Sequence, residues 1–119
     1  MTRVTVDAGA CGFKAIVRVR QVGGSRLQIH ISSPCEMLTA MNRELGVVDW
    51  KRGVFGRFLD SLVYRCAHQH VKHLDCPVPC AIIKAIQVEV GAAVPAPARI
   101  DIETALPDAG TWGGDGGQG

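Results

Sequence analysis

The sequence predicts an α+β domain, with a three- to four-stranded antiparallel sheet and about three helices packed on one face of that sheet. Apolar and polar residues alternate through much of residues 2–32, which is the period of a strand. Between residues 36 and 90 the apolar residues recur instead at helical spacing. Separate runs of strands and helices favour this class over alternating β–α units. A chain of 119 residues is long enough to bury one core.

Three strands are expected in the first part of the chain. Residues 2–7 and 13–21 both alternate, and residues 26–32 return with Leu27, Ile29 and Ile31 on one face. The segment Gly23-Gly24-Ser25 separates the last two strands and predicts a hairpin turn, since glycine reaches positive φ without steric cost.

Three helices are expected next. The first spans residues 36–45, with Ser33 as its cap and Gly46 as its end. The second spans residues 57–69, and the third runs from about Pro77 to Gly91, because prolines in a first helical turn cost no hydrogen bond. The apolar stripe of the second helix is expected to contain Phe58, Leu59, Leu62, Val63 and Cys66.

The C-terminal part predicts one further strand and a tail. Residues 99–105 alternate isoleucine with acidic residues and are interpreted as a fourth strand. Residues 106–119 contain six glycines and, apart from Trp112, no residue suited to a core, which predicts a disordered tail. The predicted organisation is therefore a single metal- or cluster-binding domain over residues 1–105, followed by the tail over residues 106–119.

Charge and hydropathy narrow the classes of function and location. The formal charge is +2 with mixed signs, which argues against a nucleic-acid-binding domain. The basic residues Lys14, Arg18, Arg20 and Arg26 are interpreted as a solvated strand face. No run of 18 apolar residues and no signal-peptide pattern is present, so we expect a cytoplasmic protein that does not enter a membrane.

The most informative stretch is residues 66–80, which holds three of the five cysteines and three of the four histidines. Thiolate and imidazole are good ligands for zinc, copper and iron–sulfur clusters. In a reducing cytoplasm, five cysteines favour ligands, reactive groups or core residues over a disulfide framework. The sequence therefore predicts a small metal or cluster site.

Cys11, Cys35 and Cys76 are the predicted ligands. Cys11 lies in a Gly-x-Cys-Gly turn, and Cys35 and Cys76 each precede a predicted helix, where the helix dipole favours thiolate. The alternative is three ordinary packed thiols. A fourth ligand is expected from His73, three residues before Cys76, or from Cys66, which also fits a core position on its apolar stripe.

Three further residues are weaker candidates. His68 and His70 are less favoured as ligands than His73. Cys80 could join the site or form a Cys-x-x-x-Cys redox pair with Cys76, although burial beside the prolines is the preferred interpretation.

These residues resemble those of the iron–sulfur assembly scaffold family of the NifU N-terminal type. Cys11-Gly12 resembles that family's early Cys-Gly turn, Cys35 its cysteine after the third strand, and the segment from His73 to Cys76 its late His-Cys element. The resemblance runs in order through residues 5–90 and implies a cluster-binding role. Phe13 stands where the scaffold has Asp, and Leu74-Asp75 separates the histidine from the cysteine.

Two further groups are similar to this chain. In the TSCPD domain, a small four-cysteine module, the counterparts would be Cys11, Cys35, Cys66 and Cys76. A group of small uncharacterised prokaryotic domains carries the same Cys-Gly-Phe and Cys-Pro-Val-Pro motifs, and that resemblance implies no activity.

The sequence thus favours a protein that binds an iron–sulfur cluster in carriage, storage, sensing or an accessory role, with zinc as the alternative centre. The expected partner is a protein, such as a redox or cluster-accepting enzyme, and an exposed sheet edge could support a homodimer. One rival is a zinc-stabilised interaction module with a surface around Trp50 and Phe55, and another is a thiol redox protein using Cys76 and Cys80. Catalytic triads and nucleotide-binding loops are absent, so enzymatic activity is not predicted.

Overall fold

The computed structural model describes residues 1–107, and most of the predicted tail, including Trp112, lies outside the described residues. The strands are β1 (Thr2–Asp7), β2 (Lys14–Gly23), β3 (Arg26–Ser32) and β4 (Val47–Asp49). The helices are α1 (Glu36–Ala40), α2 (Asn42–Leu45), α3 (Leu62–His70) and α4 (Val78–Glu89), with a 3₁₀ turn, η1, at Phe58–Asp60. The predicted α+β class is confirmed.

The sheet is an antiparallel meander in the order β1-β2-β3-β4. Asp7 pairs with Lys14, and Ile16 pairs with Ser32, so the end of β1, the start of β2 and the end of β3 lie at one end of the sheet. The predicted hairpin between β2 and β3 is confirmed, with Gly24 at φ +55°. This arrangement brings the segments after β1 and after β3 close together.

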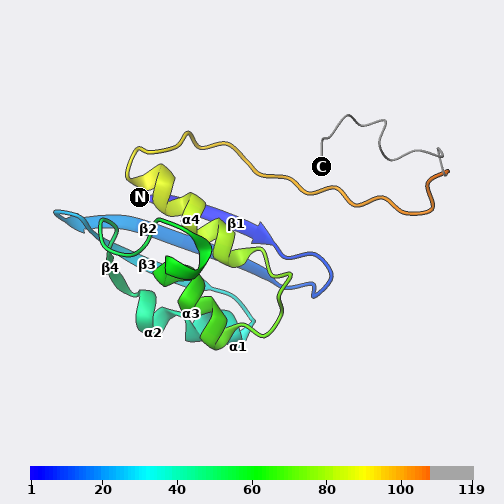
Figure 1. The fold of residues 1–119 in the computed structure, drawn as a ribbon, viewed down its shortest axis with the longest axis horizontal. Coiled ribbons are helices and arrows are strands. Elements are labelled where there is room, and N and C mark those ends of the chain that lie inside the picture. The colour runs from blue at the N-terminus through cyan, green and yellow to red at the C-terminus, as the bar shows by residue number, and fades with distance from the viewer. Residues whose placement is uncertain (108–119) are drawn as a thin grey trace.

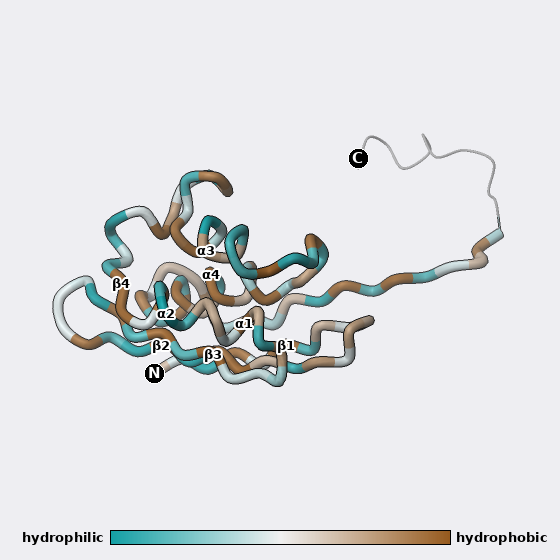
Figure 2. The backbone as a smooth tube through the Cα atoms, turned by 90° about the horizontal axis from the view of Figure 1, so that it is seen from below, coloured by the Kyte–Doolittle hydropathy of each residue, from teal (hydrophilic) through white to brown (hydrophobic). Residues whose placement is uncertain are grey.

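All helices cover one face of the sheet, as the two views together show (Figures 1 and 2). Helix α4 packs across β1 and β2, α1 and α2 pack against β3, and α3 packs on the other helices. Alternate strand residues such as Val17, Val19 and Leu27 meet Ile82 and Ile86 of α4 in the core. On the opposite face the predicted basic residues are solvated, and Lys14, Arg20 and Arg26 are all exposed.

The helix predicted over residues 36–45 is divided at Met41 into α1 and α2. Asn42 explains the division. Its side-chain amide accepts a hydrogen bond from the Ile31 N–H at 2.8 Å and donates one to the Ile31 carbonyl at 2.9 Å. The Asn42 amide thus makes the two hydrogen bonds to the backbone of β3 that a neighbouring strand would make at Ile31. These bonds hold α2 beside that edge of the sheet.

The helix predicted over residues 57–69 begins later than expected. Phe58 and Leu59, placed on its buried stripe, instead belong to η1 and are 72% and 87% exposed. The regular helix starts at Leu62, after the buried Ser61, whose hydroxyl donates a hydrogen bond to the Val54 carbonyl. The helical spacing is real only from Leu62 onward, because Ser61 ties the preceding turn to the loop.

The prediction of a strand over residues 99–105 is wrong. The segment is extended, but its isoleucines Ile100 and Ile102 are 80% and 85% exposed, and it leaves the body of the molecule (Figure 2). The fourth strand is Val47–Asp49, which pairs with Arg26–Gln28 of β3. A strand needs hydrogen-bonded partners as well as alternation, and only the shorter segment has them.

Candidate functional site

A small pocket at one end of the sheet contains the three predicted cysteine ligands. Cys11, Cys35 and Cys76 line this thiol pocket, whose volume is about 70 Å³. The three residues come from the β1–β2 loop, the start of α1 and the connection before α4, and these segments lie at the same end of the sheet (Figure 1). The cysteines are separated by 24 and 41 residues in sequence. The meander brings Cys11 and Cys35 together, and the connection between α3 and α4 adds Cys76.

Cys11 is presented by a tight loop. The Gly12 N–H donates to the Gly9 carbonyl at 2.8 Å, and the Ala8 N–H donates to the Phe13 carbonyl at 3.2 Å. Gly9 and Gly12 both have positive φ, at +83° and +74°, which other residues adopt only with strain. The two glycines therefore shape the loop that carries the exposed Cys11.

Cys35 and Cys76 are held at turns. Cys35 rather than Ser33 is the capping residue of α1, and its N–H donates to the Ser33 hydroxyl at 3.1 Å. Ser33 in turn donates to the Lys14 carbonyl, which ties this turn to the start of β2. The Cys76 N–H donates to the His73 carbonyl at 3.2 Å. Both thiols are partly buried.

The electrostatics at Cys76 differ from the sequence expectation. Helix α4 acts in the predicted direction, since a hydrogen bond from the Val78 backbone lowers the pKa of the Cys76 thiol. Burial raises it by more, and the nearby sulfurs of Cys35 and Cys11 raise it further. The net pKa of the Cys76 thiol is raised, chiefly because the thiol is partly buried and to a smaller extent because other thiols lie near it.

Two oxygen or nitrogen donors join the thiols in the pocket lining. His73, one of the predicted fourth ligands, is present and is exposed to solvent. Asp75 also lines the pocket, and sequence reasoning missed it. Its position next to Cys76 was the available signal.

The three thiols of the pocket do not form a group whose donor atoms all lie within 4.8 Å of one another. Within residues 1–107, the only trio of His, Cys, Asp or Glu side chains whose donor atoms all lie within 4.8 Å of one another is Glu44, Cys66 and His70. Tetrahedral zinc with bonds of about 2.3 Å would hold two sulfurs about 3.8 Å apart. The sulfurs of Cys11, Cys35 and Cys76 thus do not all lie within 4.8 Å of one another.

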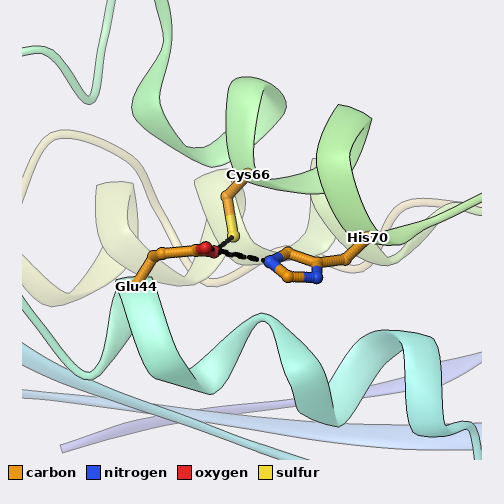
Figure 3. A group of neighbouring side chains, drawn as sticks. All are labelled: Glu44, Cys66 and His70. Carbon is orange, nitrogen blue, oxygen red and sulfur yellow. Dashed lines mark hydrogen bonds and ion pairs between the residues drawn. The ribbon is translucent and has the colours of Figure 1, made fainter.

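Cys66, the other residue predicted as a fourth ligand, lies in a different part of the molecule. It does not line the thiol pocket. Its buried Sγ lies 2.9 Å from Glu44 Oε2, and His70 Nε2 lies 2.8 Å from the same oxygen (Figure 3). Burial and the Glu44 carboxylate raise the pKa of the Cys66 thiol to about 12. Glu44 had no sequence signal, because it precedes Cys66 by 22 residues.

The remaining candidates lie outside the thiol pocket. Cys80 is exposed, so the preferred interpretation that it is buried beside the prolines is wrong. It lies beside Tyr64, whose pKa is raised by burial and by the Cys80 thiol. His68 is exposed on α3. All five cysteines are free thiols.

A larger apolar groove adjoins the thiol pocket. It has a volume of about 510 Å³ and shares Val71, His73 and Cys76 with the pocket. The exposed Phe58 and Leu59 also line it. The thiol pocket thus opens beside an apolar surface. Every helix within residues 1–107 is too short or too polar to cross a membrane.

Fold and pocket define a class of protein: a small α+β domain with a four-stranded meander, helices on one face and a cysteine-lined pocket at one end of the sheet. Residues 2–102 match the family of unknown function DUF6951, and the chain belongs to that family. No curated protein and no solved structure matches the chain. The family match supplies no activity, and the resemblance to scaffold and TSCPD domains stays a prediction.

Proposed function

We propose that this protein binds an iron–sulfur cluster in the thiol pocket through Cys11, Cys35 and Cys76. The single observation that carries the proposal is the convergence of these three thiols, from three separate segments, on one small pocket. Packed core thiols would not be expected to converge in this way, at a sheet end where one of them is exposed.

The donor set and the size of the pocket support an inorganic centre. Thiolates are the usual ligands of iron–sulfur clusters. Organic ligands usually occupy pockets of about 300–1,000 Å³, whereas the thiol pocket measures about 70 Å³. A cationic centre would also offset the mutual repulsion of three thiolates.

The spacing of the sulfurs supports a cluster over zinc. A cluster distributes its thiolate ligands over several iron atoms, so the sulfurs are held farther apart than around one ion. The three sulfurs do not meet the 4.8 Å limit that the Glu44, Cys66 and His70 donors meet. Zinc in the thiol pocket would require at least one of the three sulfurs to move closer to the others.

The test is anaerobic purification of the full chain, with iron, acid-labile sulfide and visible absorption measured on one sample. We expect iron and sulfide together, with an absorption band near ~400 nm. Cys35→Ser should remove most of both. Cys80→Ser is the matched control, since Cys80 is exposed on α4 and does not line the thiol pocket, and it should retain the centre.

Other outcomes would decide between the alternatives. Stoichiometric zinc without sulfide that is lost in Cys35→Ser would overturn the cluster and establish the zinc alternative. Iron and sulfide that survive in Cys35→Ser would place the centre elsewhere. A chain without metal, whose Cys11, Cys35 and Cys76 all alkylate freely after reconstitution with iron and sulfide, would overturn both.

The fourth ligand is proposed to be His73 or Asp75, since both line the thiol pocket. His73→Ala and Asp75→Asn separate them, because both side chains are exposed and neither change disturbs the core. The variant that removes the ligand should shift the absorption spectrum and speed loss of the cluster to a chelator. If neither variant changes the spectrum, neither residue is the ligand.

A further inference from the structure

We propose that Glu44, Cys66 and His70 form a second metal site, which takes a single zinc ion. This acid–thiol–imidazole cluster joins α2 to α3 (Figure 3). The proposal is independent of the proposed cluster site, since it uses different residues and a different centre.

The geometry of the three donors suits one ion. The donor atoms all lie within 4.8 Å of one another. Glu44 lies between the other two residues, with Oε2 at 2.9 Å from Cys66 Sγ and at 2.8 Å from His70 Nε2. Zinc bonds of about 2.0–2.3 Å to oxygen, nitrogen and sulfur require donors roughly 3–4 Å apart. Small side-chain movements would therefore open the cluster around one ion.

The donor types favour zinc among divalent ions. Thiolate is too soft a ligand for magnesium or calcium, whereas zinc accepts sulfur, nitrogen and oxygen together. The side chains of Glu44 and His70 are 40% and 21% exposed, so the ion has a route to the cluster and water can complete four ligands. Cys66 lies on the buried side, with its Sγ also 3.8 Å from the Met41 carbonyl.

The acid–thiol–imidazole cluster is distinct from the thiol pocket. None of its three residues lines that pocket. Each is placed by a helix interior or helix end rather than by the loops that carry Cys11 and Cys35. Two centres of different chemistry can therefore be held by one small domain.

Binding replaces protons and joins two helices. Zinc forms bonds to Cys66 Sγ, His70 Nε2 and a Glu44 carboxylate oxygen, and no electron is transferred. The Cys66 thiol proton is released to solvent, and His70 has to present Nε2 without its proton. Because α2 supplies one ligand and α3 supplies two, the ion would fix α3 against α2 and stabilise the fold.

The experiment measures zinc stoichiometry by competition with a chromophoric chelator, using added zinc chloride. In the full chain with Cys11→Ser, Cys35→Ser and Cys76→Ser, we expect one zinc ion and a rise in melting temperature. Adding His70→Gln should abolish both. Adding His68→Gln is the matched control, because His68 is exposed on the same helix and does not belong to the cluster.

Two further measurements keep the proposal open to refutation if the triple serine variant does not fold. In the otherwise unmodified chain, His70→Gln should bind one zinc fewer than His68→Gln. Cobalt in place of zinc should give thiolate charge-transfer absorption, and Cys66→Ser should lower it by the contribution of one thiolate whereas Cys80→Ser should not. Equal zinc binding by the His70 and His68 variants would overturn the site, as would a triple serine variant that folds but binds no zinc.

Discussion

The thiol pocket and the acid–thiol–imidazole cluster use the same residue types in opposite settings. Cys76 lies in a connecting segment at the end of the sheet and converges with two other thiols. Cys66, ten residues earlier, lies on the inner face of α3 against a carboxylate. Cys66 and Cys76 are close in sequence, but α3 ends between them at His70. The two thiols therefore lie in different segments and contact different groups.

The largest expected difference between the two regions is thiol reactivity. Burial and Glu44 raise the pKa of Cys66 from an ordinary 9.0 to about 12. At pH 8 such a thiol holds roughly 1,000-fold less thiolate than an ordinary one, and thiolate is the reactive form. In metal-free protein we expect iodoacetamide to modify the exposed Cys80 much faster than the buried Cys66, as followed by peptide mass spectrometry. Equal rates would show that Cys66 is not protected.

Asn42→Ala should weaken the acid–thiol–imidazole cluster while sparing the thiol pocket. The variant leaves the Ile31 N–H and carbonyl without their partners and frees α2, which carries Glu44. We expect a loss of about 2 kcal/mol in the free energy of unfolding, measured in denaturant, together with weaker zinc binding. Arg43→Lys, at an exposed neighbouring position, keeps the positive charge beside Glu44, so it is the control and should change neither. A large loss of iron and sulfide in Asn42→Ala would contradict the separation of the two regions.

Stability in alkaline solution should report Cys66. Its folded pKa is raised to about 12, so between about pH 9 and pH 12 the native chain retains a proton that the unfolded chain releases. The free energy of unfolding contributed by this group is therefore fully present below about pH 9 and falls as the pH rises towards 12, by up to about 4 kcal/mol. In metal-free Cys66→Ala, the free energy of unfolding should fall less steeply with pH above pH 9, whereas in Cys80→Ala it should fall as in the parent protein. Identical slopes for the two variants would refute the assignment.

Gly12→Ala is the reciprocal change, confined to the loop of the thiol pocket. No atom lies within 4 Å of the added methyl group, but φ is +74°, so the expected cost is strain of about 1 kcal/mol. Cluster content should fall, and zinc at Glu44, Cys66 and His70 should not. Gly91→Ala is the matched control, with φ +79° and open space beyond the end of α4. If both variants lose the cluster equally, the loop geometry at Gly12 has no special role.

Local pattern was sufficient for the parts of the fold that local physics controls. The first three strands follow from alternation, since one face of each is buried against helices. Alternation alone, however, did not predict the fourth strand correctly. Residues 99–105 alternate as well as any strand, but no neighbouring strand pairs with them, and β4 formed without a clear pattern because β3 offers it an edge.

By itself, the sequence determined the fold class and the three cysteines that meet at one sheet end. For Cys11 and Cys35 it could do so because an antiparallel meander places the end of β1 and the end of β3 together, whereas Cys76 reaches them through the packing of α3 and α4 on the sheet. Only the tertiary structure decided that Asp75 joins that pocket, that Cys66 leaves it, and that Glu44 meets Cys66 and His70. These contacts depend on how α2 and α3 pack across each other, which is set by the division at Asn42 and by shape in the core rather than by residue spacing.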